Sequence, residues 1–175
     1  MHNSWISNPL DCLTLMKSTK WRLDMDKKIS SILTGVAGEY FVAAELSLRG
    51  YVASITLRNT KGIDIVVSNE EGNKTVNIQV KTNRRKKPQW IMNKKAENIK
   101  DKNMFYVLVL LFDDITSPEY YIVPSRDVAN YVEKGHKKWL STPGRGGKMH
   151  KDTIMRMFED LEKRYLNKWG LLGLD

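Results

Sequence analysis

Two strand-like segments, Ile63–Ser68 and Thr75–Thr82, carry three polar residues that could do chemistry together: Asp64, Gln79 and Lys81. A carboxylate and an amide oxygen can hold a hard cation, and an amine beside them can act on a water molecule or a phosphate. This chemistry requires that the fold bring the three side chains to one place, which depends on the turn that joins the two segments.

The turn determines which residues of the two segments face each other. Both segments are rich in Ile and Val, and residues 70–73 include the Gly and Asn that are typical of a tight turn. A tip at residues 71–72 places Asp64 opposite Gln79. Because side chains alternate between the two faces of a strand, Lys81 shares a face with Gln79. The sequence therefore predicts a β-hairpin with all three polar groups on one face.

The carboxylate of Asp64 needs a cationic partner, because it directly precedes the apolar run Ile65–Val67. Lys81 is one candidate, in a structural ion pair with Gln79 as a bystander. A divalent metal is the other candidate, held by Asp64, the amide oxygen of Gln79 and a backbone carbonyl. Lys81 could then orient or deprotonate the attacking water, or stabilise charge on a phosphate. The spacing alone leaves both alternatives open.

A helix is expected upstream of the hairpin, from about Asp26 to Arg49. Gly50 is well placed to end it, and apolar residues recur at steps of three and four: Ile29, Ile32, Leu33, Val36, Tyr40, Ala43 and Ala44. Gly35 and Gly38 lie within this pattern, so either the helix begins only near Thr34 or another backbone approaches it there. Glu39 follows these glycines, close to the face that is predicted to be buried.

Further strands are predicted at Tyr51–Leu57, Met104–Phe112 and Glu119–Val123. The second of these should be buried on both faces, because its apolar run is unbroken. The intervening segment Thr82–Lys102 is predicted to be a basic, partly irregular crossover that becomes helical from about Asn93.

Two more helices are expected in the C-terminal half. Ser125 would cap a helix over Arg126–Glu133, and Asp152 would cap a closing helix that reaches about Trp169. A Gly-rich basic loop, Ser141–Lys151, lies between them. This order of elements predicts an α/β fold with a mixed sheet.

The composition is typical of one globular domain: the chain has 175 residues, of which 41% are hydrophobic and 28% charged. Residues 25–175 are predicted to form this domain, after an N-terminal extension over residues 1–24. No apolar run approaches the length of a membrane span, and the extension lacks the pattern of a signal peptide. A single cysteine, Cys12, fits the reducing cytoplasm. We therefore expect a cytoplasmic protein.

The net charge of +9 is concentrated in two segments. Lys81–Lys102 contains nine basic residues and two acidic ones, and Lys134–Lys151 contains six basic residues and no acidic one. This pattern indicates a polyanionic partner such as nucleic acid, with a solvated basic face as the alternative. Trp90 would either stack on a base or anchor the crossover in the core. The cationic side chains predicted to bind phosphates are Arg84, Arg85, Lys86, Lys87, Lys94, Lys95, Arg145 and Lys148.

The order of Gly38-Glu39 on a first helix, Asp64 at the opening of a strand, and Gln79-x-Lys81 on the next strand resembles the PD-(D/E)XK nuclease superfamily. GEYFVAAELSLRGY, GIDIVV and IQVKT are similar to its Gln-x-Lys branch, which includes Mrr-type restriction endonucleases and a group I intron homing endonuclease. The likeness covers about Thr34–Thr82. Ile63 replaces the usual Pro, and Gln79 replaces the usual acid, which removes one negative charge from the metal site.

The resemblance implies a restriction-endonuclease-like core, in which helices flank a mixed central β-sheet. It implies that Asp64, Gln79 and Glu39 bind Mg²⁺ or Mn²⁺ and that Lys81 acts on the attacking water, so that these four residues form the catalytic set. The expected activity is the hydrolysis of phosphodiester bonds in double-stranded or branched DNA, and a homodimer is an open option. The alternatives are a catalytically inactive DNA-binding module of the same fold and a protein-interaction domain.

Overall fold

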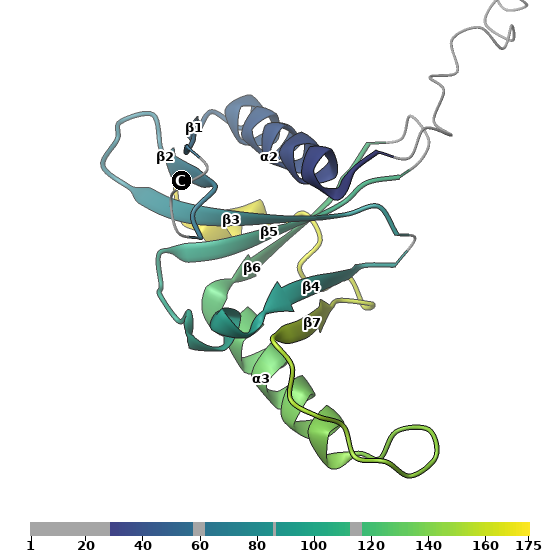
Figure 1. Ribbon diagram of the computed structural model, residues 1–175. Coiled ribbons are helices and arrows are strands. Elements are labelled where there is room, and N and C mark those ends of the chain that lie inside the picture. Colours follow the sequence, from purple (N-terminus) through teal and green to yellow (C-terminus); the bar gives the residue numbers. More distant parts are fainter. Residues whose placement is uncertain (1–28, 58–61, 86, 113–116) are drawn as a thin grey trace, which may run out of the picture.

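The computed structural model describes residues 29–57, 62–85, 87–112 and 117–175 (Figure 1). The predicted extension over residues 1–24, with Cys12, and the predicted phosphate ligand Lys86 lie outside the described residues. In the part of the chain that the structure describes, no helix combines the length and the hydropathy that a membrane span requires.

A five-stranded mixed sheet with the order β1-β2-β3-β5-β6 forms the centre of the molecule. Its strands are β1 (Val52–Ile55), β2 (Ile65–Ser68), β3 (Thr75–Asn83), β5 (Met104–Leu110) and β6 (Glu119–Pro124). Strands β3 and β5 run parallel, and the other neighbours run antiparallel. Strand β5 is buried along its whole length, as its unbroken apolar run predicted.

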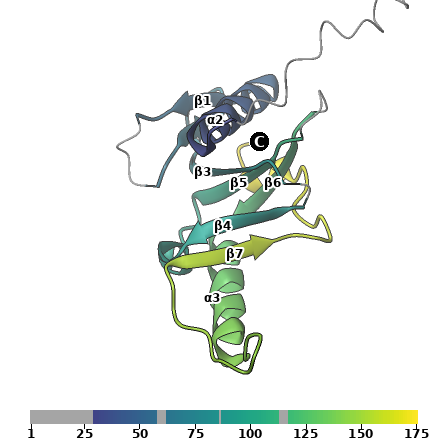
Figure 2. The same cartoon turned by 45° about the vertical axis from the view of Figure 1, so that its right-hand side comes forward.

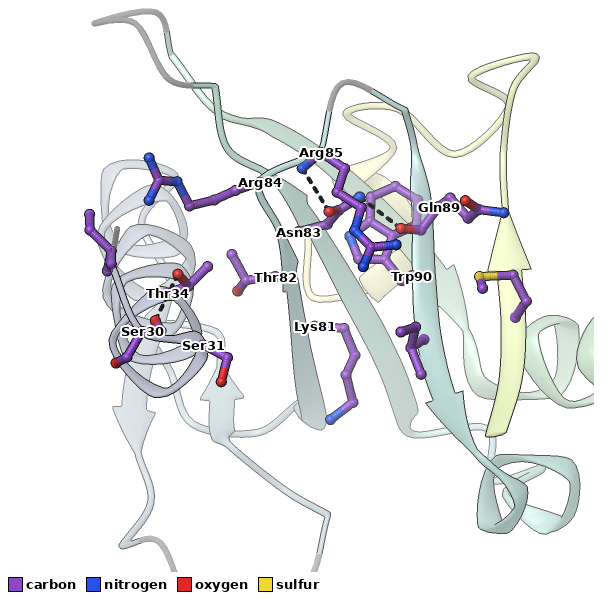
Figure 3. A pocket seen from close by; sticks show the side chains of 13 residues that line it. Ser30, Ser31, Thr34, Lys81, Thr82, Asn83, Arg84, Arg85, Gln89 and Trp90 are labelled. Atoms are coloured by element: carbon purple, nitrogen blue, oxygen red, sulfur yellow. Dashed lines mark hydrogen bonds between the residues drawn. The ribbon is translucent and has the colours of Figure 1, made fainter. Parts of the chain in front are cut away.

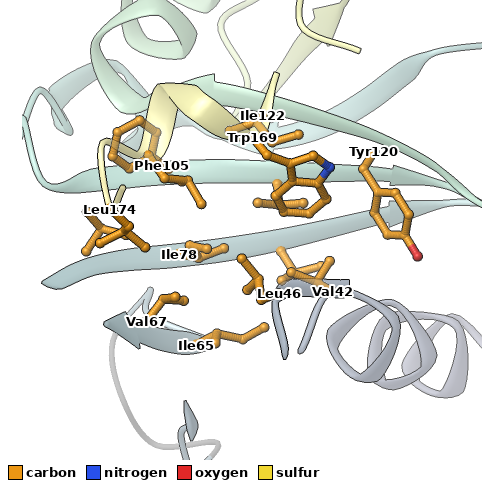
Figure 4. Close-up of a cluster of buried hydrophobic side chains, with 14 of the residues drawn as sticks. Val42, Leu46, Ile65, Val67, Ile78, Phe105, Tyr120, Ile122, Trp169 and Leu174 are labelled. Atoms are coloured by element: carbon orange, nitrogen blue, oxygen red, sulfur yellow. The ribbon is translucent and has the colours of Figure 1, made fainter. Parts of the chain in front are cut away.

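Helices lie on both sides of this sheet (Figures 1 and 2). Helix α2 (Ser31–Leu48) covers one face together with the C-terminal 3₁₀ turn η3 (Trp169–Leu172), and Figure 4 shows the apolar cluster between them, with Leu46 and Trp169 near its centre. Helix α3 (Ser125–Ser141) lies on the other side, with a two-stranded antiparallel sheet of β4 (Gln89–Asn93) and β7 (Met155–Glu159). The prediction of an α/β fold with a mixed central sheet flanked by helices is confirmed.

The β2–β3 hairpin has the predicted register. Ile65 pairs with Ile78 and Ser68 pairs with Thr75, so continuing the register by one residue places Asp64 opposite Gln79. At the turn, Gly72 has a φ of +70°, a left-handed conformation that glycine adopts at little cost.

Helix α2 packs on the sheet through a different face from the predicted one. Gly38, Val42 and Leu46 are its buried residues, whereas Leu33 and Tyr40 from the predicted stripe are exposed. The helix carries apolar residues on both sides, so their spacing does not identify the inner face.

A close approach explains the glycine at position 38. A Cβ atom there would lie 1.9 Å from Oγ1 of Thr82 on β3. The side chain of Thr82, rather than the predicted backbone, therefore fills the space beside the helix. The alternative of a late start near Thr34 is wrong, because the helix begins at Ser31 after the N-cap Ser30, whose Oγ accepts the N–H of Leu33 at 3.2 Å.

Several C-terminal predictions are wrong. Ser125 does not cap α3: its hydroxyl donates to the carbonyl of Asp101 at 2.8 Å, and the helix runs on to Ser141 rather than ending at residue 133. Asp152 caps no helix, because the chain enters strand β7 where a closing helix was predicted.

Strand β4 accounts for that error. It lies within the predicted crossover and pairs with β7 from Gln89↔Glu159 to Asn93↔Met155. Long-range pairing therefore replaces the predicted helix with a strand. The helix predicted from about Asn93 is reduced to the short 3₁₀ turn η2 (Lys94–Asn98).

Candidate functional site

Asp64 lies where the chain leaves the regular β2–β3 ladder. Its backbone N–H donates to the carbonyl of Ile78 at 2.8 Å, and its carboxylate Oδ2 accepts the backbone N–H of Val80 at 2.7 Å. The carboxylate thus accepts a hydrogen bond from a strand N–H that would pair with a backbone carbonyl in a regular ladder. This hydrogen bond fixes the orientation of the carboxylate against β3.

Gln79 and Lys81 lie on one face of β3, and Asp64 is opposite Gln79 in the register of the hairpin. Both are half-buried, whereas the alternate residues Ile78 and Val80 point into the core on the other face. The amide of Gln79 lies beside the segment that leads to Asp64, since a Cβ atom added to Gly62 would lie 4.0 Å from Nε2 of Gln79. The structure therefore brings Asp64, Gln79 and Lys81 to one face of the hairpin.

An Asp64–Lys81 ion pair is not present among the described residues. The Asp64 carboxylate accepts the N–H of Val80, and Lys81 lines a groove instead. The ammonium group of Lys81 is therefore directed to the groove rather than committed to Asp64.

Glu39 approaches this region from α2. It is half-buried and directly follows Gly38, the residue that packs against Thr82 next to Lys81 in β3. The contact places this turn of α2 beside the end of β3 that carries the polar residues, but on the face of Ile78 and Val80, opposite the face of Gln79 and Lys81. The convergence of the Glu39 carboxylate with Asp64 and Gln79 stays a prediction.

The predicted metal ligands offer oxygen donors alone: two carboxylates and one amide. This set suits Mg²⁺ or Mn²⁺, which prefer oxygen and retain several waters. In the described part of the chain, no group of three or more His, Cys, Asp or Glu residues could hold a metal ion. In the predicted ligand set, the amide of Gln79 is the third donor beside the two carboxylates.

A groove of about 840 Å³ opens beside Lys81, between the first turn of α2 and strand β4 (Figure 3). Arg84 and Arg85 line it with Lys81, and Figure 3 shows Lys81 and Arg85 in the space between β3 and β4. These positively charged residues follow one another along the end of β3 and the turn after it. The groove thus has a cationic side next to the polar face of the hairpin.

Asn83, whose importance the sequence analysis missed, shapes the turn that carries the two arginines. Its buried amide donates to the carbonyls of Lys87 at 2.9 Å and Gln89 at 2.7 Å and accepts the N–H of Arg85 at 2.7 Å. Asparagine at the end of a strand is a turn signal, because its amide can replace backbone partners. The sequence contains this turn signal, but it does not identify the groups that the amide of Asn83 bonds.

Trp90 is buried, whereas a tryptophan that stacks on a base has to expose its ring. It is 2% exposed, its indole N–H donates to the carbonyl of Val109 at 3.0 Å, and its ring packs on Tyr121. Its prediction as a nucleic-acid ligand is wrong, and the alternative of a core tryptophan is confirmed.

The remaining predicted phosphate ligands are dispersed. Lys87 is exposed after the arginine turn, and Lys94 and Lys95 lie at the end of β4. Arg145 and Lys148 are exposed in the loop beyond α3, at the end of the molecule opposite α2 (Figures 1 and 2). Of the predicted phosphate ligands that the structure describes, Arg84 and Arg85 line the groove beside Lys81.

A polar cluster around Asp152 joins the two-stranded sheet to α3. Asp152 accepts hydrogen bonds from Lys94 and His136, both at 2.8 Å, and these bonds hold the pKa of its carboxyl well below the usual range. Trp139 stacks between His136 and His150, at centroid distances of 5.3 and 4.1 Å. The cluster and the stack hold the chain on either side of the Gly-rich loop against α3.

Two solved structures are similar to this chain. One is a bacterial homing endonuclease, I-Ssp6803I, with 17% identity, a TM-score of 0.49, and coverage of 83% of this chain and 94% of that chain. The other is Hjc, a Holliday junction resolvase from Archaeoglobus fulgidus, with 15% identity, a TM-score of 0.41, and coverage of 72% and 84%. Scores and identities this low do not carry the activity of either protein over to this chain. No protein family and no curated protein matches the sequence.

Proposed function

We propose that this chain is a metal-dependent endonuclease of the PD-(D/E)XK type that hydrolyses phosphodiester bonds in DNA. The observation that carries the proposal is the placement of Asp64, Gln79 and Lys81 on one face of the β2–β3 hairpin, with Lys81 at a cationic groove. A phosphate group bound in the groove would meet the ammonium of Lys81 beside two oxygen donors. Few structural roles require that combination next to a row of arginines.

Each residue of the proposed site has a separate role. Asp64, Gln79 and Glu39 would hold Mg²⁺ or Mn²⁺, which supplies a hydroxide-like water and charge stabilisation when bound. The N–H of Val80 fixes Asp64 from one carboxylate oxygen, so that the other is presented in a defined direction. Lys81 donates to a non-bridging phosphate oxygen and offsets the negative charge that develops during attack on phosphorus.

Nicking of supercoiled plasmid DNA tests the proposal, with Mg²⁺, with Mn²⁺ and with EDTA. Asp64→Asn and Lys81→Met retain the size of the side chains but remove the charges, and each should lower the rate by a factor of about 100 or more. Glu70→Gln at the hairpin tip and Lys102→Met before β5 are matched controls, because both residues are exposed outside the groove. The controls should nick DNA at the wild-type rate. Equal nicking by Asp64→Asn or Lys81→Met would assign the activity elsewhere.

The second candidate function is DNA binding without cleavage. The observation that favours it is Gln79, a neutral residue at the metal site, together with the absence of a three-residue His, Cys, Asp or Glu cluster among the described residues. Salt-sensitive DNA binding with no nicking in either metal would select this function. A lack of DNA binding would exclude both functions and favour a protein-interaction domain.

A further inference from the structure

The groove beside Lys81 has a second side whose chemistry differs from that of its arginines. Ile91 on β4 and Met157 on β7 line it, and they are 47% and 38% exposed. They pair directly across the two strands, so their side chains form one continuous apolar patch. Ile29, also exposed, lines the groove from the segment before α2.

These side chains point outward because of strand alternation. Their neighbours Trp90, Met92, Arg156 and Phe158 fill the buried face of the two-stranded sheet. Ile91 and Met157 therefore contribute little to the core, and the fold alone does not require large apolar residues there. A single groove combines cations with an exposed apolar patch.

The combination matches one kind of nucleic-acid ligand better than another. An intact duplex presents phosphates and sugars on its outside and keeps the faces of its bases stacked within. An unpaired nucleotide presents a phosphate and an open base face together, and exposed base faces pack on flat or apolar protein surfaces. Thioether sulfur also makes favourable contacts with aromatic rings. At about 840 Å³, the groove lies within the range of pockets that enclose small organic ligands.

We propose that the groove binds an unpaired nucleotide of a DNA strand, with its base against Ile91 and Met157 and its phosphate against Arg85 and Lys81. The inference rests on the proposed function, because it assumes that DNA occupies the groove. It adds a substrate class: DNA with a single-stranded gap or flap rather than an uninterrupted duplex. Charge complementarity between the arginine side and the phosphate selects this occupant over an uncharged ligand.

Fluorescence anisotropy in EDTA tests the inference without cleavage. The probes are a labelled single strand, its fully paired duplex, and the same duplex with a short central gap. The wild type should bind the single strand and the gapped duplex more tightly than the intact duplex. Ile91→Ser combined with Met157→Ser should weaken binding of the first two probes about tenfold and leave the intact duplex unchanged. Equal binding of all three probes by the wild type, or an equal loss for all three in the variant, would overturn the inference.

Two further variants separate contact with the base from damage to the sheet. Met155→Ser is the matched control: Met155 is on the same face of β7 and 56% exposed, but it does not line this groove, so binding of every probe should stay unchanged. Ile91→Tyr adds a stacking surface and should tighten binding of the gapped duplex severalfold; no gain would count against a base at this position.

The plasmid assay reports on the proposed function independently. A protein that prefers gapped DNA through Ile91 and Met157 but cuts neither plasmid nor the gapped duplex in Mg²⁺ or Mn²⁺ would retain the inference and lose the nuclease. A protein that nicks plasmid through Asp64 and Lys81 without that preference would retain the nuclease and lose the inference.

Discussion

Gln79 sets the charge of the proposed metal site. With Asp64 and Glu39 as carboxylates and Gln79 as an amide, the site carries one negative charge fewer than it would with an acid at residue 79. Because cation affinity rises with the number of charged ligands, the protein should need a higher metal concentration than a site with three carboxylates.

Substitution of Gln79→Glu tests this effect. We expect the Mg²⁺ concentration that supports half-maximal nicking to fall on the order of tenfold. Asn77→Asp is the control, because Asn77 lies on the same face of β3, two residues away, and adds the same charge outside the proposed ligand set. An identical shift in both variants would indicate a general field effect instead of a ligand at residue 79.

Asp152 gives the protein a pH-dependent contribution to stability. Hydrogen bonds from Lys94 and His136 lower its pKa below the ordinary value of 3.8. Since the folded pKa lies below the unfolded one, the stabilisation is complete above about pH 4 and is lost as the pH falls through the folded pKa. Asp152→Asn should therefore be less stable than the wild type at pH 7, and the difference should shrink below pH 4.

Urea denaturation at pH 7 and at successive pH values below 4 measures that difference. In the Asp152→Asn background, the further change Lys94→Met should cost less stability at pH 7 than it does in the wild type, because its partner is already gone. A stability difference that is constant with pH would contradict the role of the Asp152 carboxylate.

The polar residues of the hairpin could be predicted from the sequence because local rules determine them. The predicted turn gives the observed register, although the turn bond joins the N–H of Gly72 to the carbonyl of Asn69, and the register fixes which side chains share a face. The partner of Asp64 could not be predicted in the same way. Its hydrogen bond to the N–H of Val80 depends on where β2 departs from β3, and no residue pattern marks that point.

At the level of elements, helix α2 shows what the spacing of apolar residues can predict and what it cannot. The predicted stripe from Ile29 to Ala44 follows a helical period, and a helix is present, but the packed stripe is Gly38, Val42 and Leu46. A period identifies a face only when the opposite face is polar. The inner face here is selected by fit to the sheet, with Gly38 admitting Thr82.

Two leucines on α2 test the orientation of the helix. Leu46 is 0% exposed and Leu48 is 85% exposed, although they lie two residues apart. We expect Leu46→Ala to lower the free energy of unfolding by about 2–5 kcal/mol and Leu48→Ala to change it by less than about 0.5 kcal/mol. Chemical denaturation of both variants measures the contrast. Similar losses in the two would indicate that the outer face of α2 is also covered.

Strands β4 and β7 mark the limit of prediction for elements. Each strand is five residues long, and the two lie far apart in the sequence, at Gln89–Asn93 and Met155–Glu159. Alternation of apolar and polar residues in a segment this short is also compatible with a turn or a helix end. The pairing partner therefore decides whether the segment forms a strand. The residues of β7 also fit a helical spacing, with Phe158 and Tyr165 on one side, and this spacing predicts a closing helix in place of the strand.

For the whole molecule, the two basic segments should contribute unequally to DNA binding. Arg84 and Arg85 line the groove next to Lys81, whereas Arg145 and Lys148 lie beyond α3 at the other end of the molecule. Arg84→Gln with Arg85→Gln should reduce the slope of log K against log salt by roughly two units, since each lost phosphate contact removes about 0.9 on duplex DNA.

Binding titrations at several salt concentrations measure this slope. Arg145→Gln with Lys148→Gln removes the same charge from the distant loop and should leave the slope nearly unchanged. If both double variants reduce the slope equally, DNA extends over both ends of the protein, and the groove is only one part of its path.

The pairing of β4 with β7 joins two parts of the chain that leave the ribosome at different times during synthesis. The hairpin that carries Asp64, Gln79 and Lys81 leaves the ribosome early, and its neighbour β5 follows soon after. Residues 155–159 emerge much later, and only then does β4 gain the partner that completes the apolar side of the groove. A nascent chain that has reached the Gly-rich loop therefore lacks Met157, the residue on β7 that completes the apolar patch with Ile91.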